Sequence, residues 1–179
     1  RSQKEEFQKK EKIIRRDLKN SISLQNKFAI IISGIRRCGK STLMKSIAQE
    51  IPNFYYISFE DPRLIGFELD DFQRMEAVFE SEYGKSDYYF FDEIQLVDKW
   101  EFYIRKLLDQ NKYVVITGSN ASLLSRELGT KLTGRNLRYE LFPFSYKEYL
   151  TYMNEKPNIE NFKEYLYKGG FPEYLALKN

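Results

Sequence analysis

Unbroken runs of apolar residues recur along the chain and predict buried strands. The run FAIIIS at 28–33 shows no alternation of apolar and polar positions, and YYFF and YVVIT repeat that signature further on. Strands that are buried on both faces of a parallel sheet have this pattern. Two more segments, one between prolines and one weaker, complete the expected set of strands, at residues 28–33, 53–60, 88–91, 113–117 and 136–142.

Between these strands the apolar residues recur every three or four positions, which is the period of a helix. The stripes lie at residues 43–51, 72–83 and 100–108, and the second consists of Phe72, Met75, Val78, Phe79 and Tyr83. Strands that alternate with amphipathic helices form βαβ units, whose crossovers place helices on both faces of a parallel sheet. The sequence therefore predicts a three-layer α/β domain with about five mostly parallel strands.

Both ends of the chain depart from this pattern. Residues 4–19 are rich in charged side chains around a thin apolar stripe, which predicts a helix that leans on the edge of the domain. After Pro143 the strand signal disappears, and two helices joined by a turn at Pro157 are expected. We therefore divide the chain into a basic N-terminal helix, a core, and a helical tail that begins a lid or second domain, at residues 1–27, 28–143 and 144–179.

Composition excludes several kinds of chemistry. With no histidine and one cysteine, Cys38, the chain cannot build a Ser-His-Asp triad, a Cys-His dyad, a histidine metal site or an internal disulfide. No run approaches the roughly 18 apolar residues that cross a bilayer, and the first 30 residues are charged where a signal peptide is apolar. We expect a cytoplasmic protein without a membrane partner. Because the chain starts at Arg1 instead of Met, we also expect a fragment of a longer protein.

The net charge of +3 is unevenly distributed. Residues 1–27 carry nine Lys or Arg against four Asp or Glu, which gives +5, so the remaining residues sum to −2. A surplus of this size allows weak binding of nucleic acid or another polyanion through the basic N-terminal helix. The alternative is a solvated basic helix face, and we favour it.

The segment Gly34–Ser41 (GIRRCGKS) fits G-x-x-x-x-G-K-[ST] at every fixed position and lies between a predicted buried strand and a helix. In such a loop, backbone N–H groups surround a triphosphate, and glycines remove the Cβ atoms that would block its approach. The N-terminus of the following helix adds partial positive charge. We expect nucleotide phosphates to contact Gly34, Ile35, Arg36, Arg37, Cys38, Gly39, Lys40, Ser41 and Thr42.

Several side chains of this loop have further predicted roles. Lys40 supplies a full charge for the β and γ phosphates, and the Ser41 hydroxyl is suited to ligate Mg²⁺. Arg36 and Arg37 either touch phosphate or form salt bridges with nearby acids, and we slightly favour the salt bridges. Cys38 is either a redox switch or an inert small side chain, and we favour the inert role.

Two acids, Asp92 and Glu93, end the strand at 88–91. The carboxyl end of a strand in an α/β sheet lies at the ligand-binding edge, which also carries the loop. Asp92 is expected to hold Mg²⁺ through its water shell, and Glu93 to polarise a water for attack on the γ phosphate. The alternative is an acidic turn that opens the next helix, which the presence of the loop disfavours.

The next strand ends in the segment ITGSN at 116–120. A hydroxyl or amide at this position can hydrogen-bond the γ phosphate or the attacking water. Ser119 is our first choice for this role and Asn120 our second. Capping of a short helix that starts at 121 explains the same residues equally well.

The sequence resembles the AAA+-like predicted ATPases of bacteria and archaea, in which a P-loop domain precedes a poorly characterised C-terminal region. The matching segments are GIRRCGKST, YYFFDEIQ, ITGSNASLL, LTGRNLRYELFPFSYKEYL and GGFPEYL, in that order. The resemblance implies ATP as the nucleotide, Gly34–Ser41 as Walker A, Asp92 and Glu93 as Walker B, and Ser119 near the sensor position. It also implies a sheet in which the Walker B strand is not adjacent in sequence to the first strand.

Arg135 precedes the last predicted strand, where AAA+ relatives often carry an arginine that reaches into a neighbouring subunit's site. A guanidinium there neutralises charge on the transferred phosphoryl group. This role implies a homo-oligomer. The alternatives are that Arg135 pairs with surface acids, or that Arg126 or Arg138 fills the role.

These residues predict Mg²⁺-dependent ATP hydrolysis that drives conformational change in a larger protein. A nucleotide-gated binding module with little hydrolysis is the first alternative. A small-molecule P-loop kinase is the second, and it is disfavoured because Glu93 suits activation of water and no basic lid is evident to exclude water.

Overall fold

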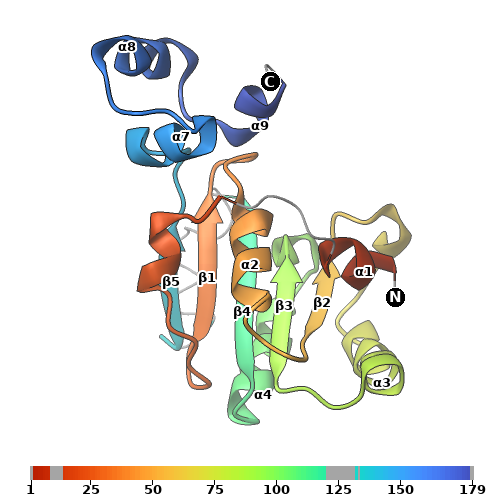
Figure 1. The fold of residues 1–179 in the computed structure, drawn as a ribbon. Coiled ribbons are helices and arrows are strands. Elements are labelled where there is room, and N and C mark those ends of the chain that lie inside the picture. The colour runs from red at the N-terminus through yellow and green to blue at the C-terminus, as the bar shows by residue number, and fades with distance from the viewer. Residues whose placement is uncertain (1, 9–13, 120–131, 133, 178–179) are drawn as a thin grey trace.

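The computed structural model describes residues 2–8, 14–119, 132 and 134–177. Its centre is a five-stranded sheet in the order β2-β3-β4-β1-β5, and all four strand pairs are parallel (Figure 1). The strands are β1 (Ala29–Gly34), β2 (Tyr55–Ser58), β3 (Tyr88–Asp92), β4 (Tyr113–Ser119) and β5 (Asn136–Glu140). The expected sheet is therefore confirmed. As the resemblance implied, β3 is not adjacent in sequence to β1, because β2 lies between them in the chain, and in the sheet β4 separates them.

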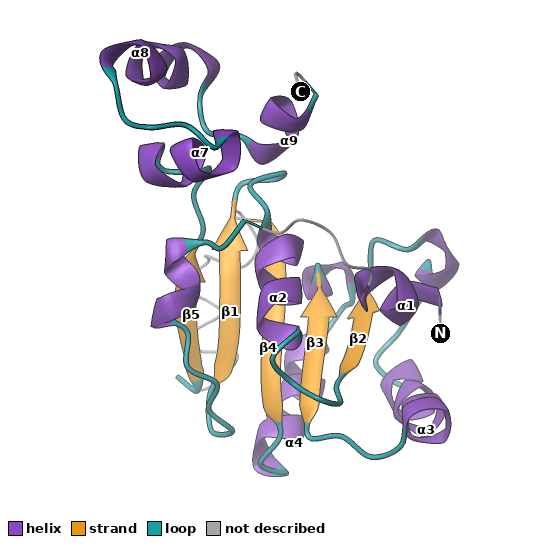
Figure 2. Cartoon of the chain, viewed as in Figure 1, coloured by secondary structure: helices purple, strands orange, loops and turns teal. Residues whose placement is uncertain are grey.

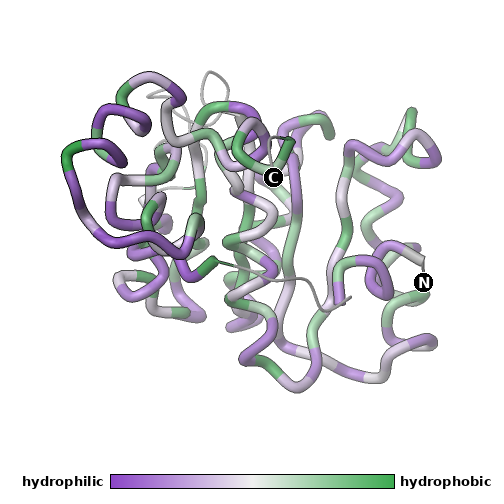
Figure 3. The backbone as a smooth tube through the Cα atoms, turned by 45° about the horizontal axis from the view of Figure 1, so that its top comes forward, coloured by the Kyte–Doolittle hydropathy of each residue, from purple (hydrophilic) through white to green (hydrophobic). Residues whose placement is uncertain are grey.

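Helices cover both faces of the sheet (Figure 2). They are α1 (Ser2–Gln8) and α2 (Lys40–Ala48) on one face, and α3 (Asp71–Tyr83) and α4 (Trp100–Asp109) on the other. Successive residues of β1 serve the two faces in turn, because Ile31 joins the core under α3 and α4 whereas Ile30 and Ile32 join the core under α2. Figure 3 shows the apolar stretches running along the central strands. The three-layer prediction is confirmed.

The prediction of a buried apolar stripe on α3 is wrong for one residue. Phe72, Met75 and Phe79 are buried, but Val78 is 57% exposed. Each residue advances the helix by 100°, so Val78 lies to one side of the line that the other three share.

Among the described residues, none of the helices has both the length and the apolar character needed to cross a membrane.

The helix expected over residues 4–19 is not continuous. α1 ends at Gln8, residues 14–16 have no regular structure, and a short 3₁₀ helix, η1, covers Asp17–Ser21. α1 does pack against the edge strand β2, as expected. The remaining 3₁₀ helices of the described chain are η2 (Pro62–Leu64) and η3 (Ile94–Leu96).

Two cations of this N-terminal segment are buried, which corrects the expectation of a wholly solvated basic face. The Lys4 ammonium donates to the Phe54 carbonyl at 2.5 Å, and burial lowers the pKa of Lys4. Arg16 has an extended backbone, with φ −81° and ψ 135°, and turns its side chain into the protein. Both cations satisfy polar groups that would otherwise be buried without partners.

The tail between residues 144 and 177 is helical, with α7 (Tyr146–Met153), α8 (Ile159–Lys168) and α9 (Pro172–Ala176). The first two helices were expected and α9 was not. Ser145 and Glu148 form a capping box that starts α7. Phe144, Tyr149, Leu150 and Leu175 make a small core, whereas Leu166 of α8 is 66% exposed. Whether this tail is a lid or a second domain stays a prediction.

Candidate functional site

The carboxyl ends of neighbouring strands bring the predicted site residues to one edge of the sheet. β1 ends at Gly34, where the glycine loop (Gly34–Ser41) begins, and Gly34 pairs in register with Ser119 at the end of β4. β3 ends at Asp92, which pairs with Ser58 of β2. The loop and the acidic end of β3 therefore meet at the same edge, as expected for parallel strands.

Two glycines allow the loop its shape. Gly34 has φ +153°, and a Cβ atom there would lie 2.3 Å from the Leu141 carbonyl oxygen. Gly39, the N-cap of α2, has φ +97°, a left-handed conformation that residues with a Cβ rarely adopt. The loop thereby brings the first turn of α2, whose N–H groups have no partner within the helix, to the carboxyl edge of the sheet.

The Lys40 ammonium lies between the loop and the end of β3. Lys40 is 5% exposed; its Nζ donates to the Ile35 carbonyl at 3.2 Å and lies 3.6 Å from Oε1 of Glu93. The other carboxylate oxygen of Glu93 accepts from Nε2 of Gln95 at 2.5 Å. Glu93 has φ +52°, a left-handed backbone of the kind that concentrates at functional sites. The lysine and the glutamate predicted to act on the γ phosphate are thus side by side.

Asp92 is buried and held by hydroxyl groups. Thr117 donates to its Oδ1, Tyr56 donates to its Oδ2 at 3.4 Å, and the Ser41 hydroxyl is a further partner. Burial raises the pKa of Asp92, and the hydrogen bonds from Thr117 and Ser41 partly offset that rise. A carboxylate beside a hydroxyl offers the hard oxygen ligands that Mg²⁺ prefers, with waters completing its shell. The residues present therefore fit Mg²⁺.

Thr117 is a site residue that the sequence analysis missed. It is fully buried; its hydroxyl donates to Asp92 and accepts from the backbone N–H of Glu93 at 3.0 Å, so it joins the two acids. A polar residue ending an apolar strand beside the acidic one was the available signal. Of the residues favoured instead, Asn120 and the side chain of Ser119 lie outside the described part of the chain.

A pocket of about 550 Å³ opens beside the glycine loop. Such a volume suits a small organic ligand. The loop, the start of α2 and the end of β3 contribute mostly charged and polar residues to its lining, and the tail and the N-terminal segment contribute mostly apolar ones. The first group includes Lys40, Ser41, Thr42 and Glu93, and the second includes Ile14, Phe144, Tyr152, Pro172 and Ala176.

The variable positions of the loop behave as the favoured interpretations predicted. Arg36 lies 3.4 Å from Glu60, and Arg37 lies 3.2 Å from Glu173 of α9. These side chains are exposed, so the pairs contribute little to stability. Cys38 is fully buried, and burial raises the pKa of its thiol, which matches the inert role.

Arg135 lies at the amino ends of the strands, whereas the glycine loop lies at their carboxyl ends. Its carbonyl accepts from the N–H of Ala29, the first residue of β1, and its guanidinium lies 2.8 Å from Asp109. It is therefore paired with a surface acid and is not part of this chain's own pocket. Arg138 is exposed on β5, and Arg126 lies outside the described residues. Action of Arg135 in a neighbouring subunit's site stays a prediction.

The fold and the site define a class of protein. Three features together characterise the α/β P-loop nucleotide-binding domains. They are a parallel sheet, a glycine loop between β1 and α2, and a strand β3 that ends in an acidic residue and is separated from β1 by β4. Residues 26–150 match the AAA domain family, and the chain belongs to that family.

The chain is also similar to individual proteins. The chain is 38% identical over 185 residues to the uncharacterised protein MJ1544 of Methanocaldococcus jannaschii, covering 96% of this chain and 41% of the relative. An uncharacterised Haemophilus influenzae protein is 36% identical over 168 residues, covering 83% and 40%. The chain thus spans about two fifths of the length of these relatives.

A solved structure shares the fold. AMPPCP-bound DnaA from Aquifex aeolicus superimposes with a TM-score of 0.57 at 18% identity, over 90% of this chain and 56% of that one.

Proposed function

We propose that this domain binds ATP with Mg²⁺ and hydrolyses it. The observation that carries the proposal is the meeting of Lys40 and Ser41, at the start of α2, with Asp92 and Glu93, at the end of β3. A cation, a hydroxyl and two carboxylates with distinct surroundings are the groups that phosphoryl transfer to water requires.

The triphosphate would lie over the glycine loop. The N-terminus of α2 and the Lys40 ammonium supply the positive charge that favours phosphate there. Ser41 and Asp92 would hold Mg²⁺, which when bound neutralises charge on the phosphate oxygens. The nucleoside would lie against apolar residues of the pocket lining, such as Ile14 and Tyr152.

Glu93 is the base in this proposal. Its carboxylate accepts a proton from the water that attacks the γ phosphorus; the bond from the γ phosphorus to the bridging oxygen breaks, giving ADP and inorganic phosphate. Lys40 faces the charge that develops on the phosphoryl oxygens. Gln95, which donates to Glu93, would fix the direction of the carboxylate.

The test is phosphate release by the wild-type chain, Glu93→Gln and Glu60→Gln. Glu60 lines the same pocket but forms an exposed salt bridge with Arg36, so it is the matched control. We expect Glu93→Gln to release phosphate at least about 100-fold more slowly and Glu60→Gln to match the wild type. Equal release by Glu93→Gln and the wild type would remove the assigned base.

A nucleotide-gated binding module with little hydrolysis is the second candidate. Two observations favour it. The two carboxylate oxygens of Glu93 already contact Lys40 and Gln95, and residues of the tail line the pocket. Tight ATP binding with very slow turnover would support it. Conformational change in a larger protein, homo-oligomer formation and nucleic-acid binding through the N-terminal segment stay predictions.

A further inference from the structure

Arg16 connects the N-terminal segment with two others that are far away in the sequence, the glycine loop and residues 142–148. Its Nη1 donates to the Cys38 carbonyl of the glycine loop at 2.9 Å, and its Nη2 donates to the Phe142 carbonyl at 2.5 Å. Its Nε forms an ion pair with Glu148 of α7 at 2.9 Å. The side chain is 6% exposed and also lines the pocket beside the loop. Arg16 precedes the residues 26–150 that match the family.

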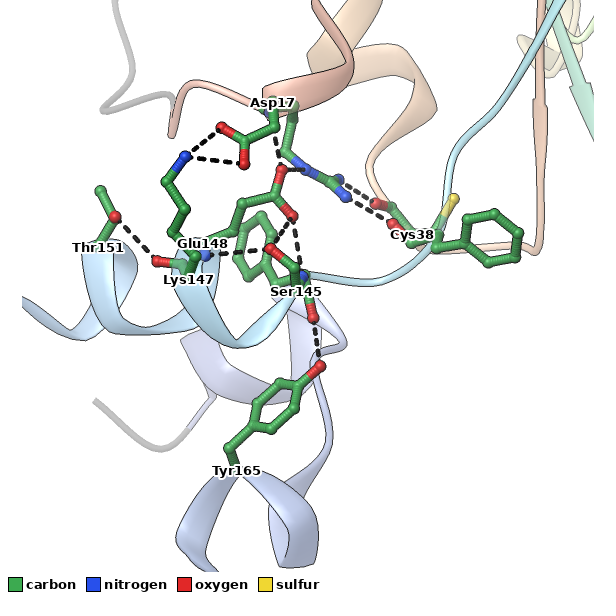
Figure 4. Close-up of polar contacts among 10 residues, drawn as sticks. Asp17, Cys38, Ser145, Lys147, Glu148, Thr151 and Tyr165 are labelled. Carbon is green, nitrogen blue, oxygen red and sulfur yellow. Dashed lines mark hydrogen bonds and ion pairs between the residues drawn. The ribbon is translucent and has the colours of Figure 1, made fainter. Parts of the chain in front are cut away.

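Glu148 is as deeply buried as its partner. Its Oε1 accepts from Arg16 and from the backbone N–H of Asp17, and its Oε2 accepts from the N–H and hydroxyl of Ser145. Figure 4 shows these contacts converging between the loop and α7. A buried ion pair whose oxygens are hydrogen-bonded in this way persists, whereas loss of one partner leaves a costly charge.

The contact with Cys38 fixes a peptide plane within the glycine loop. Cys38 lies between Arg37 and Gly39, which both have left-handed backbones, at φ +66° and φ +97°. The carbonyl and the following N–H of a trans peptide point in opposite directions. Holding the Cys38 carbonyl toward Arg16 therefore turns the Gly39 N–H away from the guanidinium. If this peptide flipped, the Cys38 carbonyl would take the side that the Gly39 N–H now occupies, and a carbonyl that faces phosphate repels it.

We propose that Arg16 is a positioning residue that holds the glycine loop ready for phosphate and couples occupation of the loop to the seating of α7. The inference rests on the proposed nucleotide binding. One rigid, planar guanidinium binds both the loop carbonyl and the tail carboxylate, so a movement of one partner moves the guanidinium and changes its contact with the other. A lysine at position 16 would keep the positive charge but would lack the planar set of N–H donors that binds both partners.

The experiment measures two properties of the chain, with a fluorescent ATP analogue and Mg²⁺ as the probe. The first is the affinity, and the second is the change in amide hydrogen exchange of α7 at saturating probe. The wild type should bind the probe and slow exchange in α7. Arg16→Lys should bind about tenfold more weakly and show no change in α7. Lys147→Gln is the matched control, because Lys147 and Asp17 form an exposed salt bridge between the same two segments.

Glu148→Gln keeps the inference testable if Arg16→Lys does not fold. Glutamine also serves in a capping box, so α7 should still form. With the Cys38 contact intact, we expect an affinity within about threefold of the wild type, but loss of the α7 response.

The outcomes separate the two proposals. Wild-type affinity with a normal α7 response in Arg16→Lys, or an α7 response retained in Glu148→Gln, would overturn the positioning role. Equal losses in Lys147→Gln and Arg16→Lys would also overturn it, as would a lower melting temperature with unchanged affinity. A wild-type chain that does not bind the probe refutes the nucleotide-binding proposal itself.

Discussion

The ammonium of Lys40 lies 3.6 Å from Oε1 of Glu93, and the two side chains are only 4% and 12% exposed. Solvent screens a pair at such depth weakly. A γ phosphate that binds Lys40 must therefore share this cation with the carboxylate, and the carboxylate itself repels the phosphate.

Glu93→Gln is therefore expected to bind ATP more tightly even as it loses hydrolysis. Removing one negative charge beside the phosphates should improve the affinity about fivefold. Isothermal titration with a non-hydrolysable ATP analogue and Mg²⁺ measures the change. Glu60→Gln should change the affinity less, because Glu60 is half exposed. Weaker binding by Glu93→Gln than by the wild type would contradict the competition for Lys40.

Thr117→Val should destabilise the domain although the two side chains have nearly the same shape. Valine removes one of the hydrogen bonds to the buried Asp92 carboxylate and the acceptor of the Glu93 N–H, which costs about 1–3 kcal/mol. Urea unfolding of the purified chain gives the loss. Thr117→Ser keeps the hydroxyl and should be closer to the wild type. Equal stability of the valine and serine variants would refute the assigned hydrogen bonds.

Gly34→Ala should be strongly destabilising, since the new Cβ would lie 2.3 Å from the Leu141 carbonyl oxygen. Either the loop or the chain after β5 must move, and we expect a loss of about 2 kcal/mol or more. Gly66→Ala is the control: Gly66 also has a left-handed φ, +82°, but nothing lies within 4 Å of its Cβ position. Thermal unfolding compares the two variants. Similar losses in both would show that backbone conformation alone, without the clash, sets the cost.

Glu148 should contribute to the loss of stability in acid. Burial raises its pKa, but the Arg16 guanidinium and the backbone amides of Ser145 and Asp17 outweigh that effect, so the pKa lies below the ordinary 4.5. A lowered folded-state pKa gives stability that is present above pH 4.5 and is lost as the pH falls through the folded value.

Unfolding free energies across acid pH test this contribution. Glu148→Gln should be less stable than the wild type at neutral pH, and the difference should shrink as the pH falls below 4.5. Asp17 pairs with Lys147 at the surface and is half exposed, so Asp17→Asn is the control and should change the stability little. A constant difference between Glu148→Gln and the wild type would contradict the account.

The sheet was predictable because burial on both faces leaves an apolar run that the sequence displays directly, as in Ile30, Ile31 and Ile32. The glycine loop was predictable because its fixed positions are close together in the chain. Both signals are local. The parallel order of the strands then placed Asp92 beside Ser41 without further information.

Arg16 could not be predicted in this way. Its carboxylate partner, Glu148, lies 132 residues further along, and no spacing links the two. The predicted N-terminal helix failed for the same reason, because an extended backbone at Arg16 is needed to reach that partner, and tertiary contacts override local helix propensity. Thr117 was missed because the hydroxyl that meets Asp92 precedes the favoured Ser119 by two residues.

The most direct test is calorimetric titration of ATP and Mg²⁺ into the wild-type chain and into Lys40→Ala. If the glycine loop holds the triphosphate, the wild type binds one ATP, and Lys40→Ala binds about 100-fold more weakly, because it lacks the cation nearest the phosphates. No heat of binding in the wild type, or equal affinities of the two chains, would contradict the account.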